Sequence, residues 1–383
     1  AGAGGAISSN SSTPSLTNCI VWGNSSGIFS TATVAYSIVQ GGYAGTGNLN
    51  ADPLFADAAN GNLQIQTCSP GIDAGTNTGA PATDFYGNAR PFNASGKPSA
   101  VTDMGAYEHS TAYDGCTLCL TSGNIVYVKA SAAGANNGKS WTDAFTDLQA
   151  ALVVANTCSD VTDIWVAAGT YKPTTGADRN ISFSMVNGVS ILGGFPDTGN
   201  PDLDDRDWVA NVTTLSGDIG AAGNSDNAYH VMQNYSNGVT NSAVLDGFTI
   251  TGGNSNHFGG GMYNRYASPS IANCIFKGNT TTSYGGGLGN ELSSSPKLTN
   301  CVFIGNTASA GGGLFNTYSS DPVLTNCSFS GNSATTAGAV YNYFAGAATM
   351  QNCIVWGNSS GIVNGIGSDA TVTYSIVQGG YTG

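Results

Sequence analysis

One motif occurs four times between residues 259 and 358, and it constrains the fold more than any other feature of the sequence. Each copy opens with a glycine-rich hexapeptide: GGGMYN (259–264), GGGLGN (285–290), GGGLFN (311–316) and AGAVYN (337–342). A second segment follows in each copy: IANCIFKGN (271–279), LTNCVFIGN (298–306), LTNCSFSGN (324–332) and MQNCIVWGN (350–358). The asparagines that close the hexapeptides are 26 residues apart: Asn264, Asn290, Asn316 and Asn342. A fixed period of this length is typical of stacked supersecondary units and not of a single globular core.

The content of each copy indicates strands. Its apolar residues form short runs separated by Gly, Asn, Ser and Pro, and no run keeps the i, i+3, i+4, i+7 spacing of a helix. Short strands joined by turns fit one period, which corresponds to one coil of a β-helix with a rise of about 4.8 Å, the ordinary spacing between strands. We therefore predict an all-β chain in which coils stack and identical residues lie above one another.

Stacking explains which residues recur. Leu298, Cys301 and Phe303 are expected to point inward and to form aliphatic, thiol and aromatic columns with their counterparts. Asn300 suits a tight bend, because Asn tolerates left-handed backbone geometry and its amide can bond to the Asn above and below. The Gly triplets suit a corner where a side chain would collide with the next coil. The predicted structural ladder consists of Cys19, Asn273, Cys274, Asn300, Cys301, Asn326, Cys327, Asn352 and Cys353.

These residues resemble a known group of proteins. The pairing of GGGL with FKGN (276–279), FIGN (303–306) and FSGN (329–332) resembles the GG-x-[ILV] and F-x-x-N repeats of polymorphic outer-membrane proteins. More broadly, the chain is similar to bacterial right-handed parallel β-helix repeat proteins of the cell surface. The resemblance implies a secreted or surface-displayed solenoid, often adhesive, with no particular chemistry. The fourth copy departs from the pattern, with AGAV and VWGN in the corresponding places.

A second, longer repeat joins the two ends of the sequence. The segment LTNCIVWGNSSGI (16–28) reappears as MQNCIVWGNSSGI (350–362), and ATVAYSIVQGGYAG (32–45) reappears as ATVTYSIVQGGYTG (370–383). The offset is 334 residues for the first pair and 338 for the second. We infer a polypeptide in which such units follow head to tail, and a local duplication of the last coils is the alternative.

The sequence divides into five predicted regions: the last coils of a preceding β-helix unit (1–45), a tail module (46–110), a linker (111–123), a strand with a capping helix (124–162) and the parallel β-helix (163–383). The tail module resembles the choice-of-anchor Q module that closes many bacterial β-helix proteins. A cover is expected at a coil end because exposed strands pair with other chains. The carboxylates of the tail module either cap turns, which we favour, or bind a cation: Asp52, Asp57, Asp73, Asp84 and Asp103.

The region 124–162 contains the one convincing helix pattern in the sequence. Ser140 and Asp143 predict a capping box at its start. The apolar stripe that follows consists of Phe145, Leu148, Leu152 and Ala155. We expect this helix to lie across the first coil as a lid.

The composition limits the partners. Among 383 residues, 9% are charged, and 23 acidic residues against 10 basic ones give a net charge of −13. No basic cluster occurs, so nucleic acid is not an expected partner, because phosphate binding needs Lys and Arg on one face. No apolar run has the length of a membrane span, and the first residues lack the regions of a signal peptide. We expect no membrane insertion in this segment, which looks like an internal fragment.

The nine cysteines form two sets. The five in the ladder are expected to be free and buried, as small apolar residues. The other four lie outside the coils, and in a secreted protein they favour two disulfides that join tail, linker and lid, with three pairings open: Cys68, Cys116, Cys119 and Cys158. A redox or zinc site at Cys116 and Cys119 is less well supported, because no helix follows the pair and the three histidines are dispersed.

Catalysis is not expected. Enzymes on this fold, such as pectate lyases and polygalacturonases, need carboxylates gathered on one face of adjacent coils. The charges of the regular coils are scattered over different registers: Arg265, Lys277, Glu291, Lys297 and Asp321. The densest acidic run is a weak calcium candidate against a solvated loop, and calcium is the one cofactor that the sequence suggests: Asp202, Asp204, Asp205 and Asp207.

We therefore predict a structural repeat unit of an extended fibre or stalk on the bacterial cell surface, outside the cell, whose main partner is itself, head to tail. Surface glycans are a second candidate partner, because an adhesin would stack sugars on aromatic side chains. The aromatic residues of the coils are Tyr263, Tyr266, Phe315, Tyr318, Tyr341 and Tyr343. A polysaccharide lyase or hydrolase is the less favoured alternative.

Overall fold

The computed structural model describes residues 6–9, 12–24, 27–29, 31–58, 61–66, 69–92, 100–109, 124–158, 160–221 and 223–381. The chain divides into two compact units, which are residues 1–120 (unit 1) and residues 121–383 (unit 2). The boundary between them falls within the segment 111–123, for which the sequence predicts a linker. No helix in the described part of the chain is long and apolar enough to cross a membrane.

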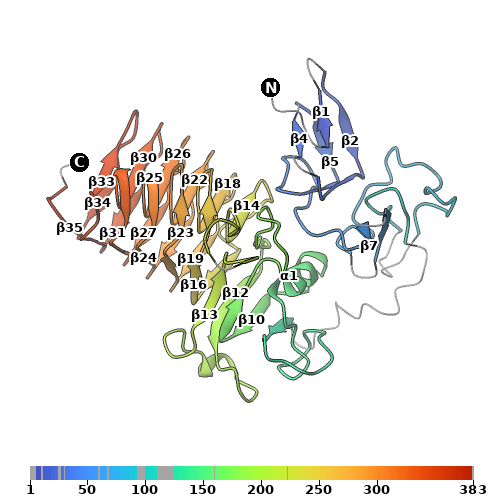
Figure 1. Cartoon of the computed structure of the whole chain (residues 1–383), viewed down its shortest axis with the longest axis horizontal. Helices are drawn as coiled ribbons and strands as arrows, with labels where there is room; N and C mark the ends of the chain where they lie inside the picture. Colours follow the sequence, from blue (N-terminus) through green and yellow to red (C-terminus); the bar gives the residue numbers. More distant parts are fainter. Residues whose placement is uncertain are drawn as a thin grey trace. The chain divides into compact units, whose positions relative to one another are not determined.

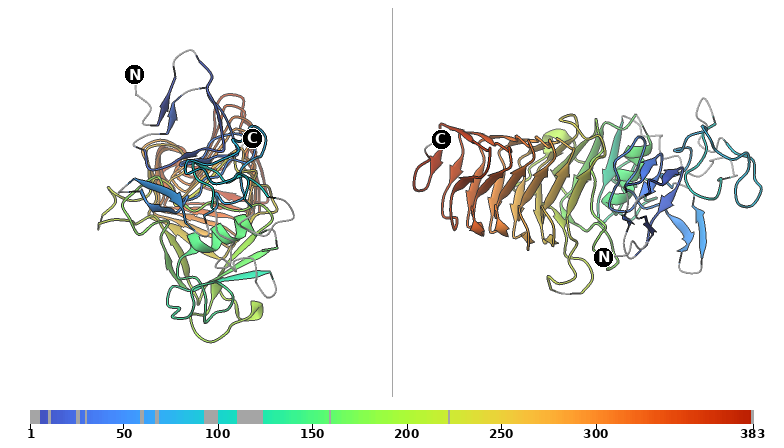
Figure 2. Two further views of the ribbon diagram at one scale, coloured as in Figure 1. Left: turned by 90° about the vertical axis from the view of Figure 1, so that its right-hand side faces the viewer. Right: turned by 90° about the horizontal axis from the view of Figure 1, so that it is seen from above.

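Unit 2 is a parallel β-helix whose strands stack in the same order as they occur in the sequence (Figure 1; Figure 2, right). Its nine-strand sheet contains β9 (Ile125–Val128), β10 (Asp163–Ala167), β12 (Ser190–Phe195), β15 (Val244–Asp246), β19 (Ser270–Ala272), β23 (Lys297–Thr299), β27 (Val323–Thr325), β31 (Thr349–Gln351) and β34 (Thr371–Thr373). Its eight-strand sheet contains β11 (Gly169–Tyr171), β13 (Thr213–Ser216), β16 (Phe248–Thr251), β20 (Ile275–Lys277), β24 (Val302–Ile304), β28 (Ser328–Ser330), β32 (Ile354–Val355) and β35 (Ile376–Val377).

Two further sheets complete the wall. The six-strand sheet contains β14 (Met232–Tyr235), β18 (Met262–Arg265), β22 (Leu288–Glu291), β26 (Leu314–Thr317), β30 (Val340–Tyr343) and β33 (Ile362–Asn364). The four-strand sheet contains β17 (Asn254–Ser255), β21 (Thr280–Thr281), β25 (Thr307–Ala310) and β29 (Ser333–Thr336). The all-β solenoid prediction is therefore confirmed, and the predicted copies are successive coils.

The core is formed by the residues that recur in the sequence. Leu298, Cys301 and Phe303 are almost fully buried and lie in register with their counterparts in adjacent coils. The Phe303 ring stacks between Phe276 and Phe329, with centroids 4.8 and 4.6 Å away and interplanar angles of 3° and 2°. The predicted aliphatic, thiol and aromatic columns are confirmed.

The glycine triplets lie at a crowded corner, as predicted. A Cβ on Gly313 would lie 2.7 Å from the carbonyl oxygen of Ala339 in the next coil. The first glycine of the triplet adopts a left-handed conformation, with φ of 62° at Gly311. Ala337 in the divergent fourth copy keeps that conformation, with φ of 55°, although a Cβ makes it unfavourable. The fourth copy therefore follows the same path with a less suitable residue.

The helix α1 (Leu148–Thr157) covers strands β9 and β10 through a buried face that includes Leu148, Leu152 and Ala155. The predicted lid is therefore present, but its predicted start is wrong. Asp147 is the N-cap and accepts from the Gln149 amide, whereas Ser140 and Asp143 bond to each other in the preceding turn. The β-helix also begins earlier than the predicted residue 163, because β9 is already the first strand of the nine-strand sheet.

Unit 1 combines short parallel strand pairs with irregular loops. The parallel pairs are β1 (Ile7–Ser8) with β4 (Ile28–Phe29), β2 (Ser15–Thr17) with β5 (Thr33–Ala35), and β3 (Ile20–Val21) with β6 (Ile38–Val39). An antiparallel pair, β7 (Phe55–Asp57) with β8 (Asn62–Ile65), follows. The rest of the tail segment is described as turns and loops, which carboxylate side chains hold together. A short 3-10 helix, η3 (Leu203–Asp205), lies in unit 2.

Candidate functional site

A buried asparagine ladder runs along the six-strand sheet. Asn264 donates from Nδ2 to Oδ1 of Asn290 over 3.0 Å, and Asn290 donates in the same way to Asn316 over 2.9 Å. The ladder continues through Asn342 to Asn364, and each bond points toward the C-terminal coils. These side chains lie inside the wall, where an unpaired amide would be destabilising. The 26-residue spacing therefore marks a hydrogen-bonded column.

A second ladder follows each inward phenylalanine. Asn306 donates from Nδ2 to the carbonyl of Phe276 and to Oδ1 of Asn332, both over 2.9 Å. Its own Oδ1 accepts from the main-chain and side-chain amides of Asn279. The F-x-x-N motif contains these asparagines, but sequence reasoning did not assign them this role.

The predicted corner ladder is confirmed in its backbone at all four asparagines and in its amides from Asn273 to Asn326. Asn273, Asn300, Asn326 and Asn352 have φ between 50° and 56°. Asn300 donates to Asn273 over 3.1 Å, and Asn326 donates to Asn300 over 3.2 Å. These bonds are exposed, and they point toward the N-terminal coils.

The five ladder cysteines are free, as predicted: Cys19, Cys274, Cys301, Cys327 and Cys353. Burial raises the pKa of Cys274 to about 12, and a hydrogen bond with the Cys301 thiol raises the pKa of Cys327 to about 12. Nucleophilic and metal-binding cysteines act as thiolates, which these pKa values disfavour near neutral pH. The thiol column is therefore a packing element.

Only one of the four disulfide candidates lies in the described part of the chain. Cys158 is buried directly after α1, and its thiol is not free. Cys68, Cys116 and Cys119 lie outside the described residues. The pairing of the four stays a prediction.

The acidic run 202–207 forms a self-contained turn. Asp202 caps η3, and the Asp205 carboxylate accepts from the Asp202 amide over 3.0 Å, so the two form a capping box. Asp204 adds a third carboxylate to this first turn. Asp207 accepts from the amides of Ala210 and Val209, and these bonds lower the pKa of its carboxyl. These carboxylates, like the other His, Cys, Asp and Glu side chains in the described ranges, do not form a group of three with the geometry to hold a metal ion. This geometry favours the solvated loop over a calcium site.

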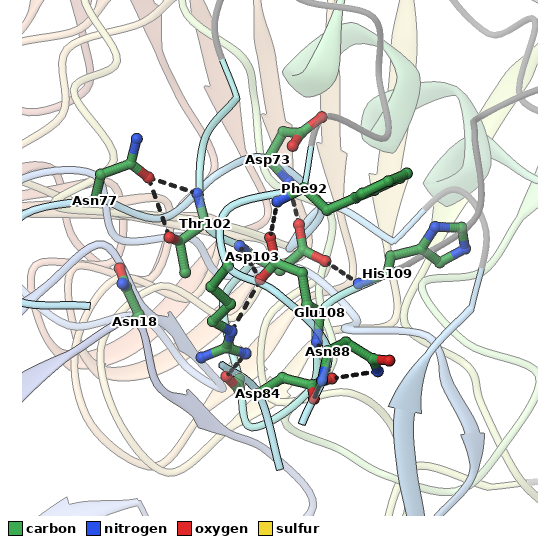
Figure 3. Close-up of polar contacts among 12 residues, drawn as sticks. Asn18, Asp73, Asn77, Asp84, Asn88, Phe92, Thr102, Asp103, Glu108 and His109 are labelled. Atoms are coloured by element: carbon green, nitrogen blue, oxygen red, sulfur yellow. Dashed lines mark hydrogen bonds and ion pairs between the residues drawn. The ribbon is translucent and has the colours of Figure 1, made fainter. Parts of the chain in front are cut away.

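The tail module contains a network of buried carboxylates (Figure 3). Asp103 is fully buried and accepts from the amides of Asp73 over 2.7 Å and His109 over 2.6 Å. Glu108 accepts from the amides of Phe92 and Asp103 and pairs with the Arg90 guanidinium at 2.9 Å. This arrangement braces loops that are far apart in the sequence.

Asp84 and Asp52 act in the same way. Asp84 accepts from the amides of Tyr86, Asn88 and Glu108, and these bonds lower its carboxyl pKa against the opposing effect of burial. Asp52 accepts from the Leu54 amide over 2.8 Å. The preferred interpretation, turn capping, therefore describes Asp52, Asp84 and Asp103.

The buried carboxyls of the tail module also have unusual proton affinities. Burial raises the pKa of Asp103 to about 7, and the nearby Glu108 carboxylate adds to the effect. Burial also raises the pKa of Glu108, although Arg90 opposes the shift. The tail module therefore contains one carboxyl, that of Asp103, whose pKa lies near neutral pH.

The prediction that the coil charges are scattered over different registers is wrong for one pair. Arg265 and Glu291 share a register position on β18 and β22, and their side chains form an ion pair at 3.5 Å. Tyr263 donates a short hydrogen bond to the same Glu291 carboxylate. The Arg265 guanidinium also lies over the Tyr235 ring, 4.7 Å from its centroid. The other three charges, Lys277, Lys297 and Asp321, do not join this cluster.

The aromatic residues of the coils differ in exposure. Tyr263 and Phe315 are buried, and Tyr341 and Tyr343 are half-buried. Tyr266 and Tyr318 keep 52% and 45% of their surface, so they are the predicted sugar-stacking residues that remain accessible. Phe344 is similarly exposed, and its ring centroid lies 5.2 Å from that of Tyr318.

A cavity of about 530 Å³ lies within unit 1. Its wall includes Ile20, Phe55 and Leu63. Among its described lining residues, the charged side chain is Arg90, which is already paired with Glu108. The cavity therefore presents apolar surface and no charged group that is available to a ligand.

Comparisons with known proteins bear on the fold. A family model described as the right handed beta helix region matches residues 221–377, which lie within unit 2. No curated protein and no solved structure matches the chain. The matched residues contain the four motif copies and the ladders described above. The chain thus contains a right-handed parallel β-helix, as the sequence predicted.

Proposed function

We propose that this chain is a structural repeat unit of an extended stalk or fibre on the bacterial cell surface, built of β-helix units that follow head to tail. The observation that carries the proposal is the use of the recurring residues. Two buried asparagine ladders connect each regular coil to the next coil, and the corner ladder and the phenylalanine stack connect the first three. Continuity of the wall is therefore what the repeat maintains.

Two further features support a mechanical role outside the cell. The motif copies resemble the repeats of polymorphic outer-membrane proteins, and the tail resembles the choice-of-anchor Q module. The low charge content, 9%, suits a wall that is stabilised by neutral amides. In this proposal the partner of one unit is the next unit of the same kind.

Electron microscopy of the producing cells with antibodies against this chain tests the proposal. A stalk predicts label along threads that extend from the cell surface, with a regular repeat. Label confined to the cell interior, or on compact particles without threads, would contradict it.

Adhesion to surface glycans is the second candidate, and the exposed Tyr266 and Tyr318 favour it. Aromatic rings stack on the apolar faces of sugars, and the nearby Arg265 and Glu291 supply hydrogen-bonding groups. Binding to a glycan array should drop at least about 10-fold in Tyr266→Ala and Tyr318→Ala, in line with the loss of a contact worth about 1.4 kcal/mol. Tyr374→Ala, at a tyrosine that is 86% exposed in the last coil, is the matched control. Equal binding by all variants would reject this candidate.

A polysaccharide lyase or hydrolase has less support. Asp202 caps its own turn, and Asp218 lies exposed at 3.7 Å from Lys172. An assay on acidic polysaccharides with Asp202→Ala and Asp218→Ala as controls tests it. Product that either substitution removes would establish an enzyme in place of a purely structural unit.

A further inference from the structure

Two coils in the molecule have the same internal structure. One contains β3 and β6 in unit 1, and the other contains β32 and β35 in unit 2. Ile38 and Ile376 both donate to the carbonyl of the ladder cysteine before them over 2.9 Å. The equivalent bends also agree, with φ of 49° at both Tyr36 and Tyr374.

Side-chain bonds repeat as well. The Ser37 hydroxyl accepts from the Cys19 amide over 3.0 Å, and Ser375 accepts from Cys353 over 2.9 Å. Gln40 accepts from Gly23 over 2.7 Å, and Gln378 accepts from Gly357 over 2.7 Å. The 338-residue offset between the second pair of segments therefore reflects equivalent positions in equivalent coils.

The two coils differ in what covers their outer edge. In unit 1, residues 46–50 lie along the edge. Tyr36 donates to the Thr46 carbonyl over 2.8 Å, Val39 donates to the Leu49 carbonyl over 2.9 Å, and Leu49 donates back to Ser37 over 2.9 Å. Asn48 adds side-chain bonds to the Ser37 amide and the Val34 carbonyl. Ile38 is 0% exposed, and its Cδ1 atom lies against Gly71 of the tail.

The same edge in unit 2 is open in the described part of the chain. β33, β34 and β35 are the outermost strands of their sheets. Ile376, the counterpart of the buried Ile38, is 58% exposed, and Tyr374 is 86% exposed. An exposed edge with apolar side chains is a template for pairing.

The corner asparagine shows a second difference. Asn18 forms a reciprocal pair with the main chain of Thr76, in which both bonds are 2.8 Å long, and its own carbonyl accepts from the Gly105 amide. Its counterpart Asn352 has the same φ of 55° and an exposed side chain. The tail module thus contacts the coil at two places, and the last coil presents both places uncovered.

We propose that the edge formed by β33, β34 and β35 is a docking face for a second tail segment with the sequence of residues 46–109. In the second tail segment, the counterparts of residues Thr46 to Asn50 form main-chain hydrogen bonds along β35. The counterpart of Thr76 in that segment bonds to the Asn352 side chain. The equivalent contacts in unit 1 identify this occupant, because they already bury the same side chains. This inference deepens the stalk proposal, because it names the contact by which one unit closes the coils before it.

The test uses the full chain and the same chain with a second copy of residues 46–109 added after residue 383, the counterpart of Gly45 by the 338-residue offset. Amide exchange is measured at Tyr374, Ser375 and Val377. Residues 36–43 and 374–381 have the same sequence, so mass spectrometry distinguishes the two coils in peptides that extend to Thr373 or Thr382, where unit 1 has Ala35 and Ala44. Docking predicts exchange that is slower by at least about 100-fold in the extended chain, because these amides gain partners.

Two variants of the extended chain sharpen the result. Ile376→Asp should abolish the added protection and leave the fold intact, because this side chain is exposed without the tail. Ile275→Asp, at a 38% exposed isoleucine in the same column of the eight-strand sheet, is the matched control and should keep the protection.

Two outcomes would overturn the inference. One is unchanged exchange at the three amides while Tyr36, Ser37 and Val39 of unit 1 remain protected. The other is a dimer of the unextended chain that Ile376→Asp dissociates, because the edge would then receive a second copy in place of a tail. Either outcome leaves the imaging test of the stalk proposal unaffected, so the two failures are distinguishable.

Discussion

The regular coils of residues 259–358 and the tail module of residues 46–109 are stabilised in opposite ways. In the coils, each buried Asn bonds to the same residue type one coil away, so the pattern continues from coil to coil. In the tail, the buried carboxylates of Asp84, Asp103 and Glu108 bond to main-chain amides that occur once, and Asp103 connects Asp73 with His109. Contacts that recur allow a further coil to be added with the same bonds, whereas contacts that occur once offer no such place for a further coil.

The comparison also concerns charge. The ladders use neutral amides, whose bonds do not depend on proton concentration. The tail uses carboxylates, and burial raises the pKa of Asp103 to about 7. Substitutions and pH should therefore affect the two regions differently, and the largest effects belong to the tail.

Replacement of Arg90 by Met should give the largest loss of stability, about 3–5 kcal/mol in unit 1, because it leaves Glu108 buried without its cation. Both side chains of this pair are nearly buried, with exposures of 5% and 0%. The loss in free energy of unfolding is measured by urea denaturation that is monitored through amide exchange in peptides from residues 61–109. Arg265→Met, in the more exposed pair with Glu291, should cost less than about 1 kcal/mol. Equal losses would mean that burial does not separate the two regions.

Replacement of Asn290 by Ala should cost about 2–3 kcal/mol, because two bonds of the buried ladder are lost and the amides of Asn264 and Asn316 lose a partner. Chemical denaturation of unit 2 followed by tryptophan fluorescence measures the change. Asn300→Gly removes two bonds, but both are exposed and the left-handed bend is kept, so its cost should stay near about 1 kcal/mol. A larger effect for Asn300→Gly would contradict the assignment of the main contribution to the buried ladder.

The tail should be more stable at pH 5.5 than at pH 8, by about 1–2 kcal/mol. The folded-state pKa of Asp103 is raised from 3.8 to about 7, so the folded tail holds a proton that the unfolded chain releases. The resulting stability is fully present below the unfolded pKa and is lost as pH rises through about 7. Glu108 shifts in the same direction, and Asp84 acts in the opposite sense only at lower pH.

Amide exchange of the tail peptides across this pH range, corrected for intrinsic rates, measures the effect. Asp103→Asn should flatten the profile, and peptides from residues 285–332 should show no comparable change. A pH dependence of equal size in those coil peptides would remove the distinction in charge.

Replacement of Ala337 by Gly should give the smallest effect, a gain of about 0.5 kcal/mol, because relief of the left-handed strain slightly exceeds the added entropy of the unfolded chain. Thermal unfolding of the full chain measures it. The matched change at Gly311, to Ala, should destabilise, because a Cβ there would lie 2.5 Å from the Leu314 carbonyl oxygen. Stabilisation by both changes would show that the corner is not crowded.

The sequence predicts the repeating region well, because one correct assignment of a coil position applies to every coil. Inward Leu298, bent Asn300 and the stacked Phe303 follow from the period alone. The pairing of Arg265 with Glu291 also follows from the period, because the two residues come directly after the aligned Asn264 and Asn290, but the prediction of scattered charges overlooked it. The start of α1 was wrong because Ser140 and Asp143 satisfy the capping pattern in a turn that ends before the helix begins.

The hydrogen-bond partners of the tail carboxylates could not be predicted from the sequence. Asp103 accepts from the amides of Asp73 and His109, which loops of no fixed period bring together. Nothing in the local sequence indicates that these two amides, and not others, are its partners. The general role, carboxylates that cap turns, follows from the residue types. Which amide each carboxylate caps depends on the whole loop arrangement.

The buried asparagine ladder also gives the wall a direction. Within this ladder, the Nδ2 groups of Asn234, Asn264, Asn290, Asn316 and Asn342 all donate toward the C-terminal coils, so each coil has a donor on one side and an acceptor on the other. The Met185 amide satisfies the first acceptor, and the Tyr381 hydroxyl receives the last donor. Rotation of a single amide would set donor against donor on one side and acceptor against acceptor on the other, so all amides of the column keep one orientation.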